Sequence, residues 1–308
     1  MVSTTPKNIF CTGSIIMDIS VRCPQFPSIG ETMYTSFPYE LAPGGKGGNQ
    51  AVAAARLGGN VKILGRLSTD DYGKELEKNL LDSNVDIQYL TKDEKEKSGV
   101  AFVWVNESGE NQIICSPAVN TKCSFDDYAK VLHNISPGDI VIITLELPGI
   151  LLEQIIKLVK EKEGFLILDP SGGDYSRLSP DLMSYIDLVK PNEVEAEILT
   201  GIKITDISSQ EKALEILEKY GVSYPLISLG ENGVIYKNNG KIIHLAGQRV
   251  NALDTTAAGD TFIGAFAAKL SHGFSIDESV QYGNIAASIC VQRRGAQSSI
   301  PSAKEVDY

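Results

Sequence analysis

Two glycine-containing stretches of this sequence combine backbone freedom with polar side chains that could do chemistry. The first, GGKGGNQAVAAARLGG over residues 44–59, sets Lys46 among four glycines and places Asn49 at the expected start of a helix. It is not a P-loop, because Gly47 follows the lysine, and Gln50 occupies the last glycine position of G-x-G-x-x-G. Glycines let a backbone approach a ligand, and Lys and Asn donate hydrogen bonds. The stretch therefore suits the binding of hydroxyl groups, with a plain turn as the alternative.

The second stretch, VNALDTTAAGDTFIGAFAAKL over residues 250–270, leads through small residues into an apolar helix. Ala257, Ala258 and Gly259 have no bulk to shield their amides, and free amides at a helix start attract anions such as a phosphoryl group in transfer. Asp260 lies in the same turn. A carboxylate there could cap the helix, or it could accept the proton of a hydroxyl nucleophile.

Short apolar runs that alternate with amphipathic segments predict an α/β fold with a mostly parallel sheet. The runs expected to form buried strands cover residues 139–146, 164–170, 186–193 and 224–230. Ligands of such sheets bind beyond the carboxyl ends of the strands. We therefore expect one rim to hold the polar residues that close these runs, which are Glu146, Asp169, Asn192 and Ser228.

Two other segments, at about residues 17–42 and 98–117, are β-prone and broken by Pro, Gly and the turn NESGEN. They predict a small antiparallel sheet built from two insertions into the main alternation. Such a flap could cover the rim of the larger part of the chain.

Composition limits the classes of partner and compartment. The net charge is −11, with acidic and basic residues interspersed, which argues against nucleic acid or an anionic membrane as a partner. No apolar run near the start is long enough for a signal peptide or a membrane span. Five cysteines without a C-x-x-C pair suit reduced thiols, so we expect a cytoplasmic protein.

The pair GGKGGNQAVAAARLG and DTTAAGDTFIGAF resembles the two signatures of the ribokinase, or PfkB, family of carbohydrate kinases, nearest to ribokinases. The likeness continues through TGSIIMDI, PNEVEAEILTG, SLGENGV and RRGAQSSIP, and so spans nearly the whole chain. It implies a single domain over residues 1–308, a Rossmann-like αβα sandwich and a β-sheet lid that serves as a homodimer interface. It also implies transfer of the γ-phosphate of ATP to the hydroxymethyl group of a sugar.

The resemblance assigns roles to individual residues. Asp260 becomes the general base, and the amides of Ala257, Ala258 and Gly259 become the anion hole. The residues expected to bind the sugar are Asp18, Ile16, Gly45, Lys46, Asn49, Glu146 and Asp260. Those expected to bind ATP are Asn192, Ser228, Gly230, Gly233, Gly259 and Asn284. Glu195 and Asn192 would organise Mg²⁺ through water, although without the family a solvated helix face explains them better.

An activating K⁺ ion is also implied, held mostly by backbone carbonyls of Asp254, Thr256, Cys290, Arg293, Gly295 and Ser299. Direct tethering of these two loops without an ion is the alternative. The resemblance to the sugar site of ribokinases is interrupted at one point, since Ile16 in GSIIMD replaces the asparagine of ribokinases. The expected substrate is a pentose, ribose first, with 2-deoxyribose or a nucleoside as the alternative. A catalytically inactive sugar sensor on the same fold is a further alternative.

Overall fold

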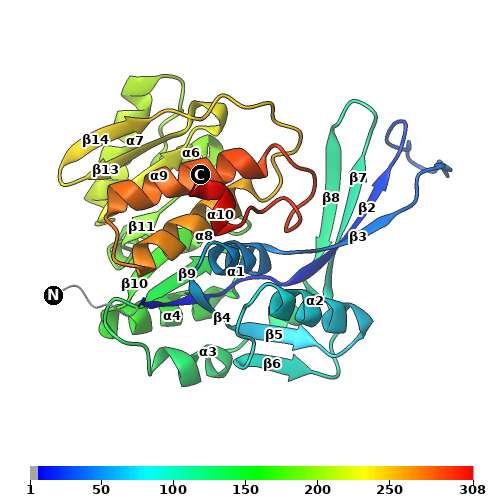
Figure 1. The fold of residues 1–308 in the computed structure, drawn as a ribbon, viewed down its shortest axis with the longest axis horizontal. Helices are drawn as coiled ribbons and strands as arrows, with labels where there is room; N and C mark the ends of the chain where they lie inside the picture. The colour runs from blue at the N-terminus through cyan, green and yellow to red at the C-terminus, as the bar shows by residue number, and fades with distance from the viewer. Residues whose placement is uncertain (1–5, 308) are drawn as a thin grey trace.

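The computed structural model describes residues 6–307, and its centre is an eight-stranded sheet (Figure 1). The strands run in the order β14-β13-β12-β11-β10-β9-β1-β4. Their bounds are β1 Asn8–Cys11, β4 Asn60–Ile63, β9 Ile140–Thr144, β10 Phe165–Asp169, β11 Leu188–Val189, β12 Tyr224–Ser228, β13 Val234–Asn238 and β14 Lys241–Leu245. The pairs from β4 to β12 are parallel, as expected, and only β13 and β14 add antiparallel pairs.

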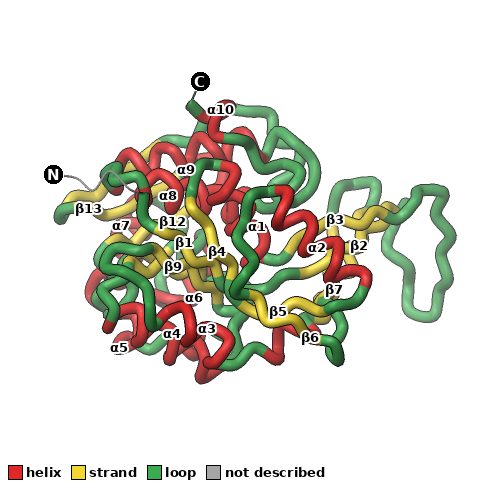
Figure 2. Tube along the Cα trace, turned by 60° about the horizontal axis from the view of Figure 1, so that its bottom comes forward, coloured by secondary structure: helices red, strands yellow, loops and turns green. Residues whose placement is uncertain are grey.

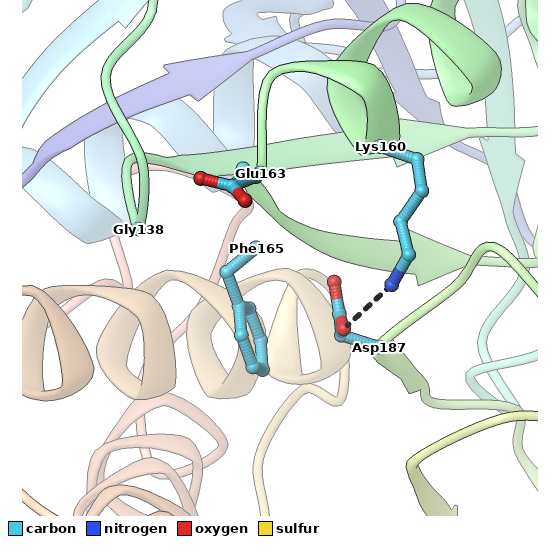
Figure 3. A pocket seen from close by; sticks show the side chains of 6 residues that line it. Gly138, Lys160, Glu163, Phe165 and Asp187 are labelled. Atoms are coloured by element: carbon cyan, nitrogen blue, oxygen red, sulfur yellow. Dashed lines mark ion pairs between the residues drawn. The ribbon is translucent and has the colours of Figure 1, made fainter.

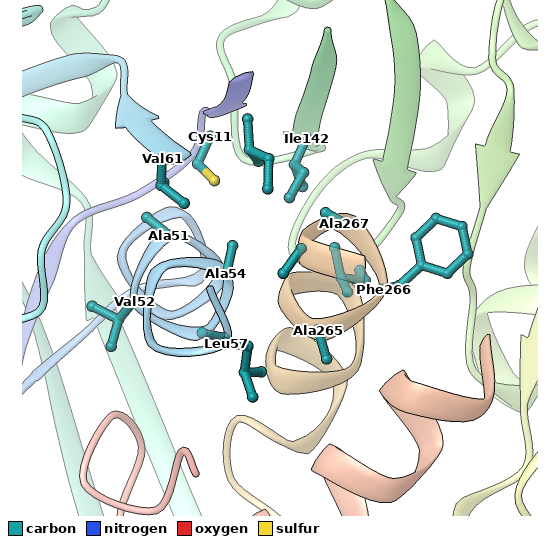
Figure 4. Packing of buried hydrophobic residues seen from close by; sticks show 14 of the residues in the cluster. Cys11, Ala51, Val52, Ala54, Leu57, Val61, Ile142, Ala265, Phe266 and Ala267 are labelled. Carbon is teal, nitrogen blue, oxygen red and sulfur yellow. The ribbon is translucent and has the colours of Figure 1, made fainter. Parts of the chain in front are cut away.

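Strand β9 shows why helices must cover both faces of this sheet. All five residues of its sequence IVIIT are buried, and alternate side chains point to opposite faces. Ile140 and Ile142 pack with α1 (Lys46–Arg56) and α8 (Ala258–Ser271), where small alanines face the sheet (Figure 4). Val141 and Ile143 pack on the other face, against the apolar side chains of α3 (Phe125–Leu132) and α4 (Gly149–Glu161). The result is the expected αβα sandwich.

The remaining elements complete the two helical layers and one small sheet. They are α2 Asp71–Asp82, α5 Pro180–Met183, α6 Glu193–Thr200, α7 Ile207–Lys219, α9 Ile276–Cys290 and α10 Ala303–Val306, with strands β5 Gly65–Ser68 and β6 Leu90–Asp93. Helices α1 and α8 approach very closely. A Cβ at Gly264 would lie 2.5 Å from Cβ of Ala53, so only glycine fits there. Within residues 6–307, no helix is long and apolar enough to cross a membrane.

The two insertions form a separate four-stranded sheet that stands to one side of the sandwich (Figure 1). We call it the lid, and its strands are β2 Ile16–Arg22, β3 Glu40–Gly44, β7 Gly99–Val105 and β8 Asn111–Ser116. The pairs β2–β3 and β7–β8 are antiparallel, one from each insertion, whereas β2 and β7, which join the two pairs, run parallel. Figure 2 shows the connection from β2 to β3 as a long loop at the outer end of the lid.

Helix α1 begins earlier than the sequence suggested. We expected Asn49 at its start, but the helix begins at Lys46, so two glycines lie within its first turn. Gly45 precedes it with a φ of 82°, a conformation that favours glycine. A Cβ at Gly47 would lie 2.7 Å from the carbonyl carbon of Gly13. The glycines therefore let a helix, rather than a loop, begin against the end of β1.

Candidate active site

The predicted base lies where the first turns of α1 and α8 meet. Asp260 is 7% exposed, and its two carboxylate oxygens each accept one amide hydrogen bond. Nδ2 of Asn49 donates to Oδ2 at 2.9 Å, and Nε2 of Gln50 donates to Oδ1 at 2.9 Å. The same Nε2 donates at 2.8 Å to Oδ2 of Asp169, the last residue of β10. Burial raises the pKa of Asp260, Lys46 lowers it, and Asp169 raises it further, so the net direction is upward.

Lys46 places its ammonium group among the carboxylates of the rim. Burial alone would lower the pKa of this lysine, but attraction to the carboxylates outweighs burial and raises it. Those carboxylates, in order of decreasing effect, belong to Asp260, Asp169, Glu146 and Glu195. The loop after β10 closes over them, because a Cβ at Gly172 would lie 3.2 Å from Cε of Lys46. Lys46 is therefore a permanent cation at the centre of the site.

Glu146 and Asp18 supply two further acceptors. Oε2 of Glu146 accepts a hydrogen bond from the backbone amide of Ser14 at 3.0 Å, and burial raises the pKa of this glutamate. Asp18 lies on lid strand β2 and covers Gly44, where a Cβ would lie 2.8 Å from Cγ of the aspartate. Burial raises the pKa of Asp18 to about 6. Ile16 precedes it by two residues on the same strand face and is 4% exposed.

The start of α8 has the geometry of an anion site. Ala257 adopts a left-handed conformation with φ of 60°, which turns the chain into the helix. The amide of Ala258 donates to the carbonyl of Thr255 at 3.2 Å, but among residues 6–307 the amides of Ala257, Gly259 and Asp260 have no acceptor. They are therefore available to a ligand.

Lys190 also belongs to this region, and the sequence analysis missed it. Its side chain is 5% exposed, and its ammonium nitrogen lies 3.0 Å from the position of a Cβ at Gly259. It forms no ion pair or side-chain hydrogen bond with any residue from 6 to 307. The residue directly follows the short strand β11, so its place at the end of a buried strand was the available signal.

Asn192 and Glu195 form a capping box at the start of α6. Oδ1 of Asn192 accepts from the amide of Glu195, and Oε2 of Glu195 accepts from the amide of Asn192, both at 2.9 Å. Burial raises the pKa of Glu195. The cap uses Oε2 of Glu195 and Oδ1 of Asn192, and it leaves Oε1 of Glu195 and Nδ2 of Asn192 for a ligand. The helix-capping and ligand-binding interpretations are therefore compatible.

The predicted nucleotide residues gather beside this cap. Ser228 ends β12 and bridges to Asn192, and its amide donates to the carbonyl of Pro191 at 2.9 Å. Gly230 and Gly233 turn the chain with φ of 56° and 89°. Asn284 of α9 donates from Nδ2 to the carbonyl of Ala246 at 2.9 Å, on the loop that follows β14.

The two loops expected to hold K⁺ lie together and are tethered directly. Asp254 accepts from Oγ1 of Thr256 at 2.6 Å and from the amide of Gly295 at 2.9 Å. Although burial opposes them, these hydrogen bonds lower the pKa of Asp254. Sγ of Cys290 lies 3.0 Å from Oγ of Ser299. Arg293 instead pairs with Glu305 of α10, so only its backbone remains for the loop.

A pocket of about 280 Å³ lies at the opposite edge of the sheet (Figure 3). Phe165 begins β10 there, and Lys160 pairs with Asp187 at 3.7 Å. This edge carries the amino ends of the strands, and none of the predicted site residues lines the pocket. The predicted site residues therefore lie away from this pocket, and the carboxyl ends of the strands remain the expected ligand edge.

A buried carboxylate beside free helix amides, with lysines on either side, is the arrangement of an enzyme that transfers a phosphoryl group to a hydroxyl. On this sandwich with its lid, it defines a carbohydrate kinase. Residues 6–303 match the pfkB family carbohydrate kinases, and the chain belongs to this family.

Relatives of known name agree with this class. The chain is 37% identical to a ribokinase of Haemophilus influenzae, over 97% of both chains. It is 29% identical to a deoxyribokinase of Salmonella typhi, also over 97% of both chains. The structure of an Arabidopsis thaliana ribokinase complexed with ribose and ATP superposes with a TM-score of 0.88, at 32% identity and 98% coverage of both chains.

The raised pKa of Asp18 gives a direct test of the site's electrostatics. A raised pKa means that Asp18 is protonated at pH 5 and ionised at pH 7.5. In a carbon-13 NMR titration of the aspartate carboxyls, we expect one signal to titrate near pH 6 and to vanish in Asp18→Asn. Exposed Asp174, whose pKa is lowered by hydrogen bonds from Ser176, serves as the control. Titration of Asp18 below about pH 4, the ordinary range, would contradict the burial argument.

Proposed function

We propose that this protein is an ATP-dependent ribose kinase, which transfers the γ-phosphate of ATP to the hydroxymethyl group of the sugar. The observation that carries the proposal is the position of Asp260, held by Asn49 and Gln50 of α1 and adjoining the free amides of α8. A sugar hydroxyl beside this carboxylate would lose its proton to Asp260 as it attacks phosphorus. The names of the relatives support the choice of ribose.

The residues around the base divide into two groups with separate tasks. On the sugar side, Lys46 and Asn49 donate to hydroxyl groups, while Asp18 and Glu146 accept from them, and Gly45 lets the backbone approach. On the phosphate side, the free amides of Ala257 and Gly259 meet the charge that develops on the phosphoryl group, whereas the amide of Ala258, also expected there, is engaged by the Thr255 carbonyl. Lys190 lies against Gly259 and adds positive charge at the same place.

ATP and Mg²⁺ would occupy the other half of the rim. Glu195 keeps Oε1 outside its capping box, and an oxygen ligand of this kind suits Mg²⁺ or its bound water. Nδ2 of Asn192 can donate to a phosphate. Ser228, Gly230 and Gly233 would line the nucleotide, and Asn284 would border its base. Bound Mg²⁺ would supply neutralising charge for the phosphates.

The lid suggests closure over the sugar and pairing with a second copy. Asp18 and Ile16 reach the site from β2, so the lid contributes directly to the sugar pocket. Its exposed apolar side chains, Phe102 at 42%, Ile113 at 58% and Ile114 at 60%, suit a homodimer interface. The free state of all five cysteines suits the cytoplasm.

Phosphorylation assays with ATP and Mg²⁺ over pentoses, 2-deoxypentoses, hexoses and nucleosides test the proposal. We expect ribose to be phosphorylated and Asp260→Asn to lower kcat by about 10² to 10⁴ while sugar and ATP still bind, because the variant lacks only the base. Survival of turnover within a few-fold would reduce Asp260 to a helix cap. Tight sugar binding without any turnover by the wild type would favour a sugar sensor.

Potassium is proposed as an activator that adds positive field beside the anion hole and orders its amides. At fixed Mg²⁺ and ionic strength, we expect K⁺ to raise kcat more than Na⁺ does. Asp254→Ala should weaken this response, because Asp254 joins the two loops through Thr256 and Gly295. Equal rates in K⁺, Na⁺ and a bulky organic cation would leave tethering as the only role of these loops.

A second candidate substrate, 2-deoxyribose, is favoured by buried Ile16 on the face of β2 that carries Asp18. A sugar hydroxyl against isoleucine loses its water partner, at a cost of about 1 to 3 kcal/mol. Ile16→Asn should therefore raise kcat/KM for ribose relative to 2-deoxyribose by about tenfold, since 1.4 kcal/mol is one decade. A wild type that already prefers ribose strongly, with a ratio unmoved by the substitution, would make Ile16 a packing residue only.

A further inference from the structure

Gln50 contacts two carboxylates through one nitrogen, and its bond to Asp169 has no role in the mechanism described above. Its side chain is completely buried on α1. Nε2 lies 2.9 Å from Oδ1 of Asp260 and 2.8 Å from Oδ2 of Asp169. Oε1 has no hydrogen-bond partner among the residues that the structure describes.

The hydrogen-bond donors and acceptors around the Gln50 amide decide its orientation. The NH₂ group carries two hydrogens, and each can be given to one carboxylate. With the amide reversed, Oε1 would face two carboxylate oxygens, and both would need a proton. In this orientation the facing oxygens of Asp260 and Asp169 both act as hydrogen-bond acceptors.

Asp169 in turn is held from its other side. Oδ1 accepts from Oγ of Ser171 at 2.7 Å and from the amide of the same serine at 3.2 Å. It ends β10, a strand buried along most of its length, and is 3% exposed. Asp169 is thus a fixed anchor at the sheet, and Gln50 joins that anchor to Asp260 on α8.

We propose that Gln50 and Asp169 form a positioning pair for the catalytic base. Gln50 fixes one oxygen of Asp260 while Asn49 holds the other, and Asp169 prevents the Gln50 amide from rotating away. This inference rests on the proposed role of Asp260 as base. The two members act oppositely on its basicity: the Gln50 hydrogen bond stabilises the charged form of Asp260, whereas the Asp169 charge destabilises it.

Other groups also face Asp260, and the test has to hold them constant. Those on the elements packed around it are Lys46 of α1, Glu146 after β9, Asn49 of α1, Cys290 of α9 and Lys190 beside Gly259. Burial raises the pKa of the Cys290 thiol, which keeps it neutral. Substitutions at 50 and 169 leave all of these groups in place.

The experiment compares Gln50→Leu and Asp169→Asn with the wild type in two measurements. The first is the pH profile of kcat/KM for ribose, in which protonation of Asp260 produces the acid limb. The second is carbon-13 NMR titration of the Asp260 carboxyl, assigned by its loss in Asp260→Asn. The NMR titration does not depend on turnover.

The two variants should shift the pKa of Asp260 in opposite directions. Gln50→Leu removes a hydrogen bond to the charged form, so the Asp260 pKa and the acid limb should rise by about one pH unit, and kcat should fall about ten- to hundredfold. Asp169→Asn removes a negative charge and keeps an oxygen for Gln50, so the acid limb should move to lower pH. A purely structural role gives no such pair of opposite shifts.

Asp139→Asn is the matched control. Asp139 is also buried, at 2% exposure, and accepts from the amides of Asn8 and Ser136, but it lies at the amino end of β9. The Asp139→Asn substitution should leave the titration of Asp260 unchanged.

Two outcomes would overturn the inference: identical Asp260 titration curves in the wild type, Gln50→Leu and Asp169→Asn, or shifts of both variants in the same direction. If Gln50→Leu does not fold, Gln50→Met, which also lacks the amide donor but is unbranched like glutamine, takes its place in both measurements. A wild type without kinase activity would refute the proposed function, while the NMR shifts would still decide the pair.

Discussion

The structure depends on one electrostatic constraint: several carboxylates are buried at one rim, and they must be compensated there. Lys46 supplies the central positive charge, and amides of Asn49 and Gln50 satisfy the oxygens of Asp260. Burial of like charges without such partners would be costly and would leave the carboxylates protonated. All three compensating residues lie in the first turn and a half of α1, so the position of that one helix governs the chemistry of the site.

Close packing places α1 where it is needed. At its start, Gly47 lies against the backbone of Gly13, at the end of β1. Further along, Ala53 meets Gly264 of α8. These contacts leave no room for larger side chains, and they bring the donors of α1 to Asp260 on α8. Small residues in a sequence suggest a flexible chain, but here they allow α1 and α8 to pack closely against each other.

Local structure and ligand binding share residues throughout the rim. Asn192 and Glu195 cap α6 with one side-chain polar atom each, and the second polar atom of each side chain lies outside the cap, where we propose that the nucleotide binds. Asp254 tethers two loops at the place proposed for K⁺. In the capping box, helix capping and ligand binding use different side-chain atoms, so the two interpretations are compatible. In the two loops, tethering already engages both side-chain oxygens of Asp254, so an ion there would depend on other atoms.

The sequence by itself predicted an α/β fold, its buried parallel strands and the small second sheet, because these follow from local periodicity and from turn residues, and the family resemblance implied the αβα sandwich. The sequence also identified Lys46, Asn49 and Asp260, because their residue types and neighbouring residues indicate a chemical role. The sequence predicted a start of α1 three residues too late, because glycines disfavour a helix and only the contact with Gly13 favours a helix there.

Gln50 was noted only as a mismatch to a glycine motif, although it lies one helical turn from Lys46. Its two hydrogen bonds join residues 119 and 210 positions away, and Lys190 likewise meets Gly259 only in space. Such pairings depend on how the helices pack on the sheet, and no local pattern encodes that packing.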